Sequence, residues 1–295
     1  MTVLLQFLVN GIVAGSVFAL IALGFALIFT ASRVFHFAHG GVYTVAAFAG
    51  YTVLVKLGGG LVAAFLAAIV VGAALGVLIN RTLYEPMRAA GVSPFVMMIS
   101  SFGVLIILTN LAAIVWGTNP VVLSHGRLVS VVPIGPVFTT GAQLQILGVT
   151  ATLAVALLVF FKHTRLGIAV RALGSDAELA EVMGMPAARL RDAAFAVGSG
   201  LAGVGALLVG FNVGIIDFNM GFDTILMATV AMIVGGLGNV AAAAGGGIVL
   251  GLIQNLAVWQ ISSKWQQALS FVVLILVLLF RPRGLFGERQ PSVGL

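Results

Sequence analysis

The sequence is short of charged residues and contains no cysteine. Only 7% of its 295 residues are Asp, Glu, Lys or Arg, whereas 61% are hydrophobic; soluble domains have roughly 25% charged residues. Without cysteine, disulfide bonds and thiol catalysis are excluded. The mean hydropathy of +1.21 therefore indicates a protein that is embedded in a membrane.

The motifs of common catalytic sites are also missing. No lysine follows a glycine, so the GxxxxGK[ST] loop of P-loop ATPases is absent. The sequence has no HExxH zinc motif, no GxSxG nucleophile turn and no paired carboxylates within an apolar run. His36 and His39 are three residues apart, but no Cys, Asp or Glu stands beside them, so we predict no metal site. The chain is therefore not expected to be an enzyme.

Long apolar runs predict an all-α polytopic fold. A membrane helix needs about 20 apolar residues to cross roughly 30 Å of hydrocarbon, and the alternating ten-residue strands of a membrane barrel are not seen. The first run lacks a basic start and continues into further membrane sequence, so we expect a retained helix rather than a cleaved signal peptide. The candidate crossings are 3–30, 39–57, 61–80, 94–116, 143–161, 193–213, 223–238, 240–260 and 265–280.

The region 223–260 allows two interpretations. It holds either two short helices broken at 235–239 or one crossing with a re-entrant piece. We therefore predict one transmembrane domain, 1–295, with about 8–9 helices, possible broken or re-entrant pieces and a weak internal repeat. Glycines four residues apart put two small residues on one helix face and predict close packing: Gly11/Gly15, Gly72/Gly76 and Gly247/Gly251.

The basic residues orient the chain. With the N-terminus outside and the C-terminus in the cytoplasm, eleven of the fourteen Lys and Arg residues fall in inner segments, and only Lys56, Arg127 and Lys264 fall outside. Because the basic residues are scattered among loops, we expect no nucleic-acid partner. The outer loop 117–142 is rich in β-branched residues, Gly and Pro, and predicts an extracytoplasmic hairpin. This hairpin either contacts an external partner or covers the helix ends.

The polar segment 162–192 interrupts this apolar sequence. Its 31 residues hold five of the fourteen basic and four of the eight acidic residues. Ser175 is predicted to cap a helix that Gly184 ends, and the early acidic residues suit its N-terminus. The small apolar face accompanies an acidic polar face, which favours insertion into a protein groove over lipid binding. The expected docking residues are Ser175, Asp176, Glu178, Leu179, Ala180, Met183 and Gly184.

Two glycine-containing interruptions are candidates for a translocation pathway. One follows the first apolar run, and the other divides the 223–260 region. Interrupted helices at corresponding places in two halves are typical of transport sites. The neutral polar residues in the spans suit either a small polar or zwitterionic solute or ordinary hydrogen bonding between helices. The candidate pathway residues are His39, Gly40, Gly236, Gly238 and Asn239.

Four motifs in order carry a family resemblance. The segment 171–185 resembles the cytoplasmic coupling loop of ABC importer permeases, with Ala180 followed four residues later by Gly184. Phe37-Ala38-His39-Gly40, the glycine-rich stretch 235–239 and the ending 280–287 resemble the branched-chain amino-acid permeases of LivH type. The likeness covers nearly the whole chain.

This resemblance implies a subunit of a heteromeric importer in the bacterial inner membrane. ATPase subunits would bind the 175–185 helix and use the ATP, so this chain would bind no cofactor itself. A second, LivM-like permease would complete the pore, and a periplasmic solute-binding protein would deliver branched-chain or related amino acids. Urea or short-chain amides are an alternative cargo, and a stand-alone carrier or channel for a small neutral solute is an alternative of another class.

Overall fold

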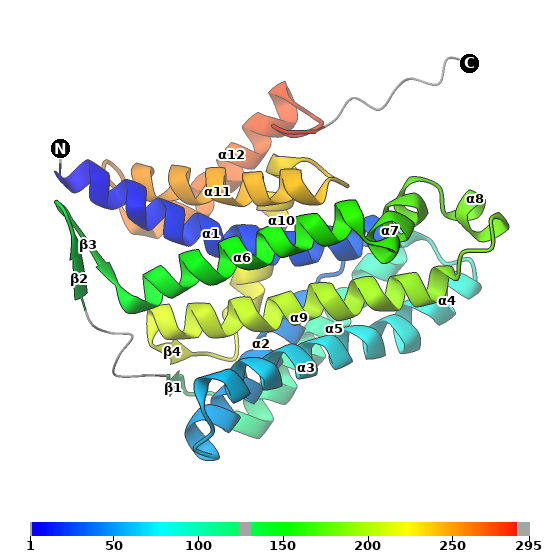
Figure 1. Cartoon of the computed structure of the whole chain (residues 1–295), viewed down its shortest axis with the longest axis horizontal. Coiled ribbons are helices and arrows are strands. Elements are labelled where there is room, and N and C mark those ends of the chain that lie inside the picture. The colour runs from blue at the N-terminus through cyan, green and yellow to red at the C-terminus, as the bar shows by residue number, and fades with distance from the viewer. Residues whose placement is uncertain (1, 124–130, 288–295) are drawn as a thin grey trace.

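The computed structural model describes residues 2–123 and 131–287, and it is mostly helical (Figure 1). The first half contains α1 (Thr2–Ser32), α2 (Ala38–Tyr51), η1 (Thr52–Lys56), α3 (Leu61–Ile79), η2 (Asn80–Tyr84), α4 (Glu85–Ala89), α5 (Pro94–Trp116), β1 (Val121–Val122), β2 (Val131–Ile134) and β3 (Val137–Thr140). The second half contains α6 (Gly141–His163), α7 (Arg165–Ser175), α8 (Ala177–Val182), α9 (Ala187–Val213), β4 (Ile215–Ile216), α10 (Met220–Gly235), α11 (Val240–Ala257), η3 (Ser263–Trp265) and α12 (Gln266–Phe280).

Eight helical segments are long and apolar enough to cross a membrane, which agrees with the predicted 8–9. The exception among the predicted crossings is 223–238, where α10 has 16 residues. At 1.5 Å per residue it is about 24 Å long, shorter than the roughly 30 Å of hydrocarbon. The predicted break follows it at 236–239, and of the two helices beside the break only α11 reaches the length of a crossing. Figure 1 shows α10 running across the direction of α1 and α11, and α10 packs against α1, α2, α11 and α12.

The glycine pairs pack helices together as predicted. A Cβ on Gly15 of α1 would lie 2.8 Å from the Cα of Ile248 on α11, and one on Gly11 would lie 3.0 Å from Leu252. A Cβ on Gly72 of α3 would lie 2.5 Å from the backbone oxygen of Ser199 on α9. Real side chains do not fit at such distances, so these glycines allow α1 to pack on α11 and α3 on α9.

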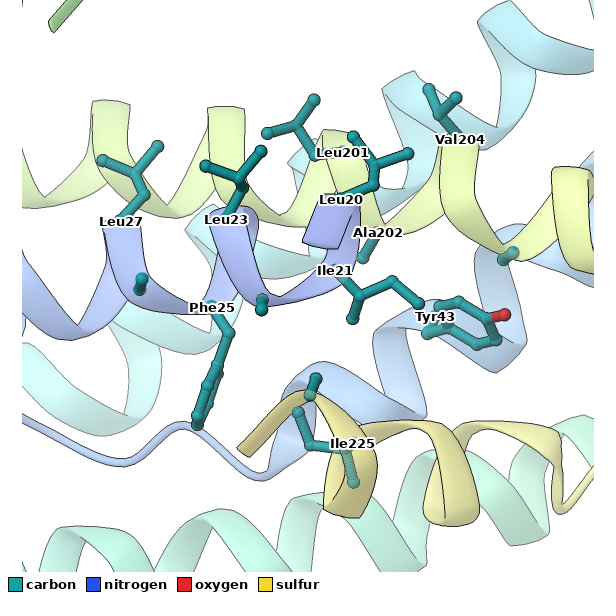
Figure 2. Packing of buried hydrophobic residues seen from close by; sticks show 14 of the residues in the cluster. Leu20, Ile21, Leu23, Phe25, Leu27, Tyr43, Leu201, Ala202, Val204 and Ile225 are labelled. Carbon is teal, nitrogen blue, oxygen red and sulfur yellow. The ribbon is translucent and has the colours of Figure 1, made fainter. Parts of the chain in front are cut away.

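Helices α1 and α9 form the centre of the bundle. Figure 2 shows Leu20, Ile21 and Phe25 of α1 facing side chains from α2, α9 and α10, and all three are fully buried. By contrast, α5 and α12 expose apolar residues such as Ile107 and Leu279 to the surroundings. Such a surface suits lipid, because a helix satisfies its backbone internally and offers only side chains to the bilayer.

The two ends of the bundle carry different structures. At the N-terminal end β2 and β3 form the predicted antiparallel hairpin, which two hydrogen bonds between Gln6 and the backbone of Phe138 join to α1. A second short pair joins β1 to β4. The rest of the predicted loop, 124–130, lies outside the described residues. Helices α4, α7 and α8 lie at the opposite end (Figure 1).

Candidate functional site

The 162–192 segment folds as the end of α6, then α7 and α8, and the start of α9. The predicted cap at Ser175 is wrong. Ser175 is the last residue of α7 and its hydroxyl donates to the backbone oxygen of Arg171. Asp176 caps α8 instead, because its carboxylate accepts from the backbone N–H of Leu179 at 2.9 Å. The backbone between α7 and α8 turns to an extended conformation at Asp176, and this single residue of extended chain decides which side chain can reach the new helix.

The C-terminal end of α8 is closed by a Schellman motif. The N–H of Gly184 donates to the carbonyl of Glu181 at 2.9 Å, and the N–H of Met185 donates to that of Ala180 at 3.0 Å. Gly184 has a φ of +79°, a left-handed conformation that glycine adopts without steric cost. Caps at both ends therefore stabilise a helix of only six residues, a length at which isolated helices do not persist.

One face of α8 is left exposed by the part of the chain that the structure describes. Leu179, Val182 and Met183 expose 58%, 79% and 72% of their surface, whereas Ala180 on the other face is buried. Three exposed apolar side chains on a helix that lies at one end of the molecule, beside polar loops, are unusual for a lipid-facing surface. They match the apolar face that the sequence predicts.

Helix α7 ties this face to the end of α1. The guanidinium of Arg33 donates to the carbonyl of Gly174 near the end of α7. A Cβ on Gly174 would lie 2.6 Å from the carbonyl oxygen of Thr30, so the glycine is needed for the close approach. Arg33 has a φ of +56° and is the one non-glycine residue with positive φ in the described parts of the chain. This strained conformation ends α1 and starts the segment 33–37.

A cluster of charged residues lies between α4 and α9. The Nε and Nη2 of Arg191 donate to the two carboxylate oxygens of Glu85 at 2.6 and 3.2 Å. Arg88 pairs with the same carboxylate at 2.9 Å and also donates to the carbonyl of Ser32 at 3.4 Å. Arg191 reaches Glu181 of α8 at 3.9 Å. The side chains of Arg191 and Glu85 are 7% and 24% exposed, so their pair is largely inside the fold, whereas the Glu181 side chain is 57% exposed.

A neighbouring pair is more exposed. The Nε of Arg81 lies 2.8 Å from the carboxylate of Asp192, and 67% of the Arg81 side chain is exposed. The side-chain amide of Asn80 also donates to Asp192 at 2.9 Å. This pair joins α9 to η2, the helical segment before α4.

The segment 33–37 is packed among aromatic side chains. The hydroxyl of Tyr84 lies 2.8 Å from Nδ1 of His36, and the ring of Phe195 meets His36 edge-on. Ser101 of α5 accepts from the N–H of Phe37 at 3.0 Å, and its hydroxyl lies 3.2 Å from the carbonyl of Phe35. Burial, and secondly the nearby His39, lower the pKa of His36 well below its ordinary value, so His36 is neutral near pH 7.

The predicted pathway residues lie at opposite ends of α10. His39 is fully buried in the first turn of α2, and a Cβ on Gly40 would lie 2.5 Å from the carbonyl of Gly221 in the first turn of α10. Thr44 of α2 accepts from the N–H of Gly221 at 3.1 Å. Gly236 follows the last turn of α10. The fold thus brings His39 and Gly40 together, but not with the glycine-rich break.

The glycine-rich break is covered by the C-terminal segment. The N–H groups of Leu285 and Phe286 donate to the carbonyls of Val234 and Gly235 at 2.8 and 2.9 Å, which satisfies the end of α10. Positive φ angles at Gly236 and Gly238 reverse the chain. The side chain of Asn239 accepts from the N–H of Ala242 and caps α11. Two motifs far apart in the sequence therefore form one structural unit.

Sequence reasoning missed several members of this site. Glu85, Arg191, Tyr84 and His36 had no assigned role, although the Tyr-Glu dipeptide stands at the end of an apolar run. No group of three or more His, Cys, Asp or Glu residues that could hold a metal ion occurs in residues 2–123 and 131–287.

Comparisons with known proteins give sequence matches over nearly the whole chain. A family model described as branched-chain amino acid transport system / permease component matches residues 7–278. The high-affinity branched-chain amino acid transport system permease protein LivH of Escherichia coli K12 is 33% identical, with 97% of this chain and 96% of the relative covered. The corresponding protein BraD of Pseudomonas aeruginosa is 32% identical with the same coverage. A chain of the solved structure titled PsaBC from Streptococcus pneumoniae in complex with Fab has a TM-score of 0.47 at 16% identity, covering 96% of this chain and 91% of that one.

Proposed function

The chain belongs to the family of branched-chain amino acid transport permeases, and we propose that it is the transmembrane permease subunit of an ATP-driven importer for branched-chain or closely related amino acids. It hydrolyses no ATP itself and binds no cofactor. The observation that carries this proposal is the pairing of a membrane bundle with a short, doubly capped helix, α8, whose apolar side chains are left exposed by the described residues.

Helix α8 is the proposed docking element for an ATPase subunit. Asp176 and Gly184 hold it in shape, Ala180 packs against the fold, and Leu179 and Met183 present apolar surface. An amphipathic helix of this kind inserts into a groove of a partner protein. Since the sequence lacks a phosphate-binding loop, the energy for transport enters through this contact.

The other partners follow from the family. A second, LivM-like permease would line the pore together with this chain, and a solute-binding protein would deliver the amino acid on the outer side. We place the protein in a bacterial inner membrane with α8 and the C-terminus in the cytoplasm and the N-terminus outside. The support is the charge bias of eleven basic residues to three and the position of Arg81, Arg88 and Arg191 at the same end as α8.

His39 and Gly40 are the proposed pathway residues of α2. His39 is buried without a hydrogen-bond partner for either ring nitrogen, at the point where the first turns of α2 and α10 meet. Helix N-termini and a neutral imidazole can satisfy a polar solute without a buried charge. The glycine-rich break is assigned to the pathway with less direct support, because the C-terminal segment covers Gly236.

Uptake measurements with defined subunits test the function. The chain would be reconstituted in liposomes alone and together with its ATPase subunits, second permease and binding protein, and uptake of labelled leucine followed. We expect uptake only in the full assembly with ATP. Leucine flux through the chain alone would indicate a stand-alone carrier or channel, and ATP-driven uptake of urea but not of leucine would assign the cargo to amides.

A further inference from the structure

A continuous series of side-chain contacts leads from α8 to the segment between α1 and α2. Glu181 of α8 is paired with Arg191 of α9, and Arg191 holds both carboxylate oxygens of Glu85 on α4. The residue before Glu85 is Tyr84, whose hydroxyl lies 2.8 Å from Nδ1 of His36. His36 is three residues before His39 in the first turn of α2. Three regions that are distant in the sequence, 181–191, 84–85 and 36–39, are therefore in sequential contact.

Two other contacts reach the same segment from the same direction. Arg88, which shares the Glu85 carboxylate, donates to the carbonyl of Ser32 at the end of α1. Arg33 donates to the carbonyl of Gly174 on α7. The short stretch 32–36 therefore accepts a hydrogen bond from a side chain of α4 and donates one to the backbone of α7, the helix that precedes α8.

The Arg191–Glu85 pair is the central link. The guanidinium binds the carboxylate through two parallel donors, an arrangement that fixes orientation as well as distance. Its 7% and 24% exposed side chains are largely withdrawn from water, so the pair cannot exchange its partners for solvent without cost. A link of this kind moves as a unit instead of stretching.

We propose that Arg191 and Glu85 are positioning residues that transmit movement of α8 to the segment 33–37 and so to the first turn of α2. This inference rests on the proposed function, since it presumes that an ATPase moves α8. Before α8 moves, the Arg191–Glu85 pair fixes the position of α4 relative to α9. When α8 is displaced, Arg191 carries Glu85 and Tyr84 with it, and Tyr84 shifts His36.

A matched control lies one residue further along the chain. Asp192 is an acidic residue on the same helix, paired with Arg81 at 2.8 Å, and within the described residues its side-chain bonds go to Asn80 and Arg81 of η2 rather than to α8 or the segment 33–37. Asp192→Asn removes an ion pair from the same end of the bundle and leaves the proposed link intact. Arg191→Lys keeps the charge of the link but cannot form the two-donor fork.

The test compares the number of ATP molecules hydrolysed per leucine imported by the complete importer in proteoliposomes. In Glu85→Gln we expect this ratio to rise about fivefold or more, the lower range of typical coupling effects, with a smaller rise in Arg191→Lys. Both hydrolysis and uptake are normalised to the amount of assembled complex. A purely structural role of the pair lowers both in proportion and therefore leaves the ratio of ATP to leucine unchanged. Asp192→Asn should leave it at the wild-type value.

Three results would overturn the proposal. They are a wild-type ratio in Glu85→Gln, an equal rise in Asp192→Asn, and failure of both Glu85→Gln and Arg191→Lys to assemble, which would make the pair structural only. If Glu85→Gln alone does not assemble, the ratio in Arg191→Lys decides. A wild-type complex without ATP-driven uptake would count against the proposed function rather than against this link.

Discussion

Removing the N-cap of α8 should weaken coupling between the ATPase subunit and the permease. The hydrogen bond that the cap makes sets the size of this effect. In Asp176→Ala the backbone N–H of Leu179 loses its acceptor, now at 2.9 Å. Loss of such a cap costs about 1 kcal/mol, which lowers the ratio of folded to unfolded helix roughly fivefold. Because α8 has only six residues, it has few internal hydrogen bonds that could compensate for the lost cap.

The effect should appear as weaker binding of the ATPase subunit. The affinity for the ATPase subunit falls in proportion to the fraction of permease in which α8 is folded. If Asp176→Ala leaves α8 mostly unfolded, the loss of affinity approaches about fivefold. Binding can be measured by titrating the purified ATPase subunit onto the permease in nanodiscs. Leucine uptake at subsaturating ATPase should fall in parallel.

Asp176→Asn separates the cap from the charge. Asn caps helices about as well as Asp, so we expect near-wild-type binding in this variant. If Asp176→Ala binds as well as wild type, the cap does not control docking and the reasoning fails. If Asp176→Asn is as weak as Asp176→Ala, the negative charge rather than the hydrogen bond is what matters.

Three further substitutions test other parts of the fold. Gly184→Ala forces a side chain into a φ of +79° and should cost α8 about 1–2 kcal/mol, whereas Gly184→Asn should cost less; the same ATPase titration measures both. Gly15→Ala places a Cβ 2.8 Å from Ile248 and should lower the unfolding temperature in detergent by separating α1 from α11, whereas Gly148→Ala meets nothing within 4 Å and should not. Thr44→Val leaves the buried N–H of Gly221 without its acceptor and should destabilise the protein by about 1–3 kcal/mol, an expectation that an unchanged melting curve would contradict.

The packing of the bundle was predictable because it depends on local spacing. Two glycines four residues apart must lie on one helix face, and the structure confirms that Gly11 and Gly15 meet α11 and that Gly72 meets α9. The crossing lengths were predictable for the same reason. Helix α10 has 16 residues, like the predicted segment 223–238, but lies three residues earlier. It was counted as a crossing because it is apolar, although it is shorter than the other spans.

The site was predictable only where its residues are neighbours in the chain. The exposed apolar face of α8 was inferred from the order of residues within one turn, and Gly184 ends the helix as expected. The cap was misplaced by one residue, because Ser175 and Asp176 are equally good caps and only tertiary packing ends α7 after Ser175. The Arg191–Glu85 pair joins residues 106 apart, and no local pattern specifies such a partner.

Helix α8 combines an outer face that is free with ends that are fixed. At its start, Gly174 of the preceding helix is held against Thr30 and bonded to Arg33; beyond its C-terminal end, the first turns of α9 carry Arg191, bound to Glu85. In the docking role that we propose for α8, a helix held in this way has little conformational freedom to lose on binding, so more of the binding energy remains available for movement. Because of the same attachments, a displacement of α8 also pulls on the end of α1 and on the first turns of α9. These two helices form the centre of the bundle. The ion pairs of the described residues all lie at this end of the bundle. Elsewhere the helices are held by close packing, and a densely packed interior transmits a displacement of α8 rather than absorbing it.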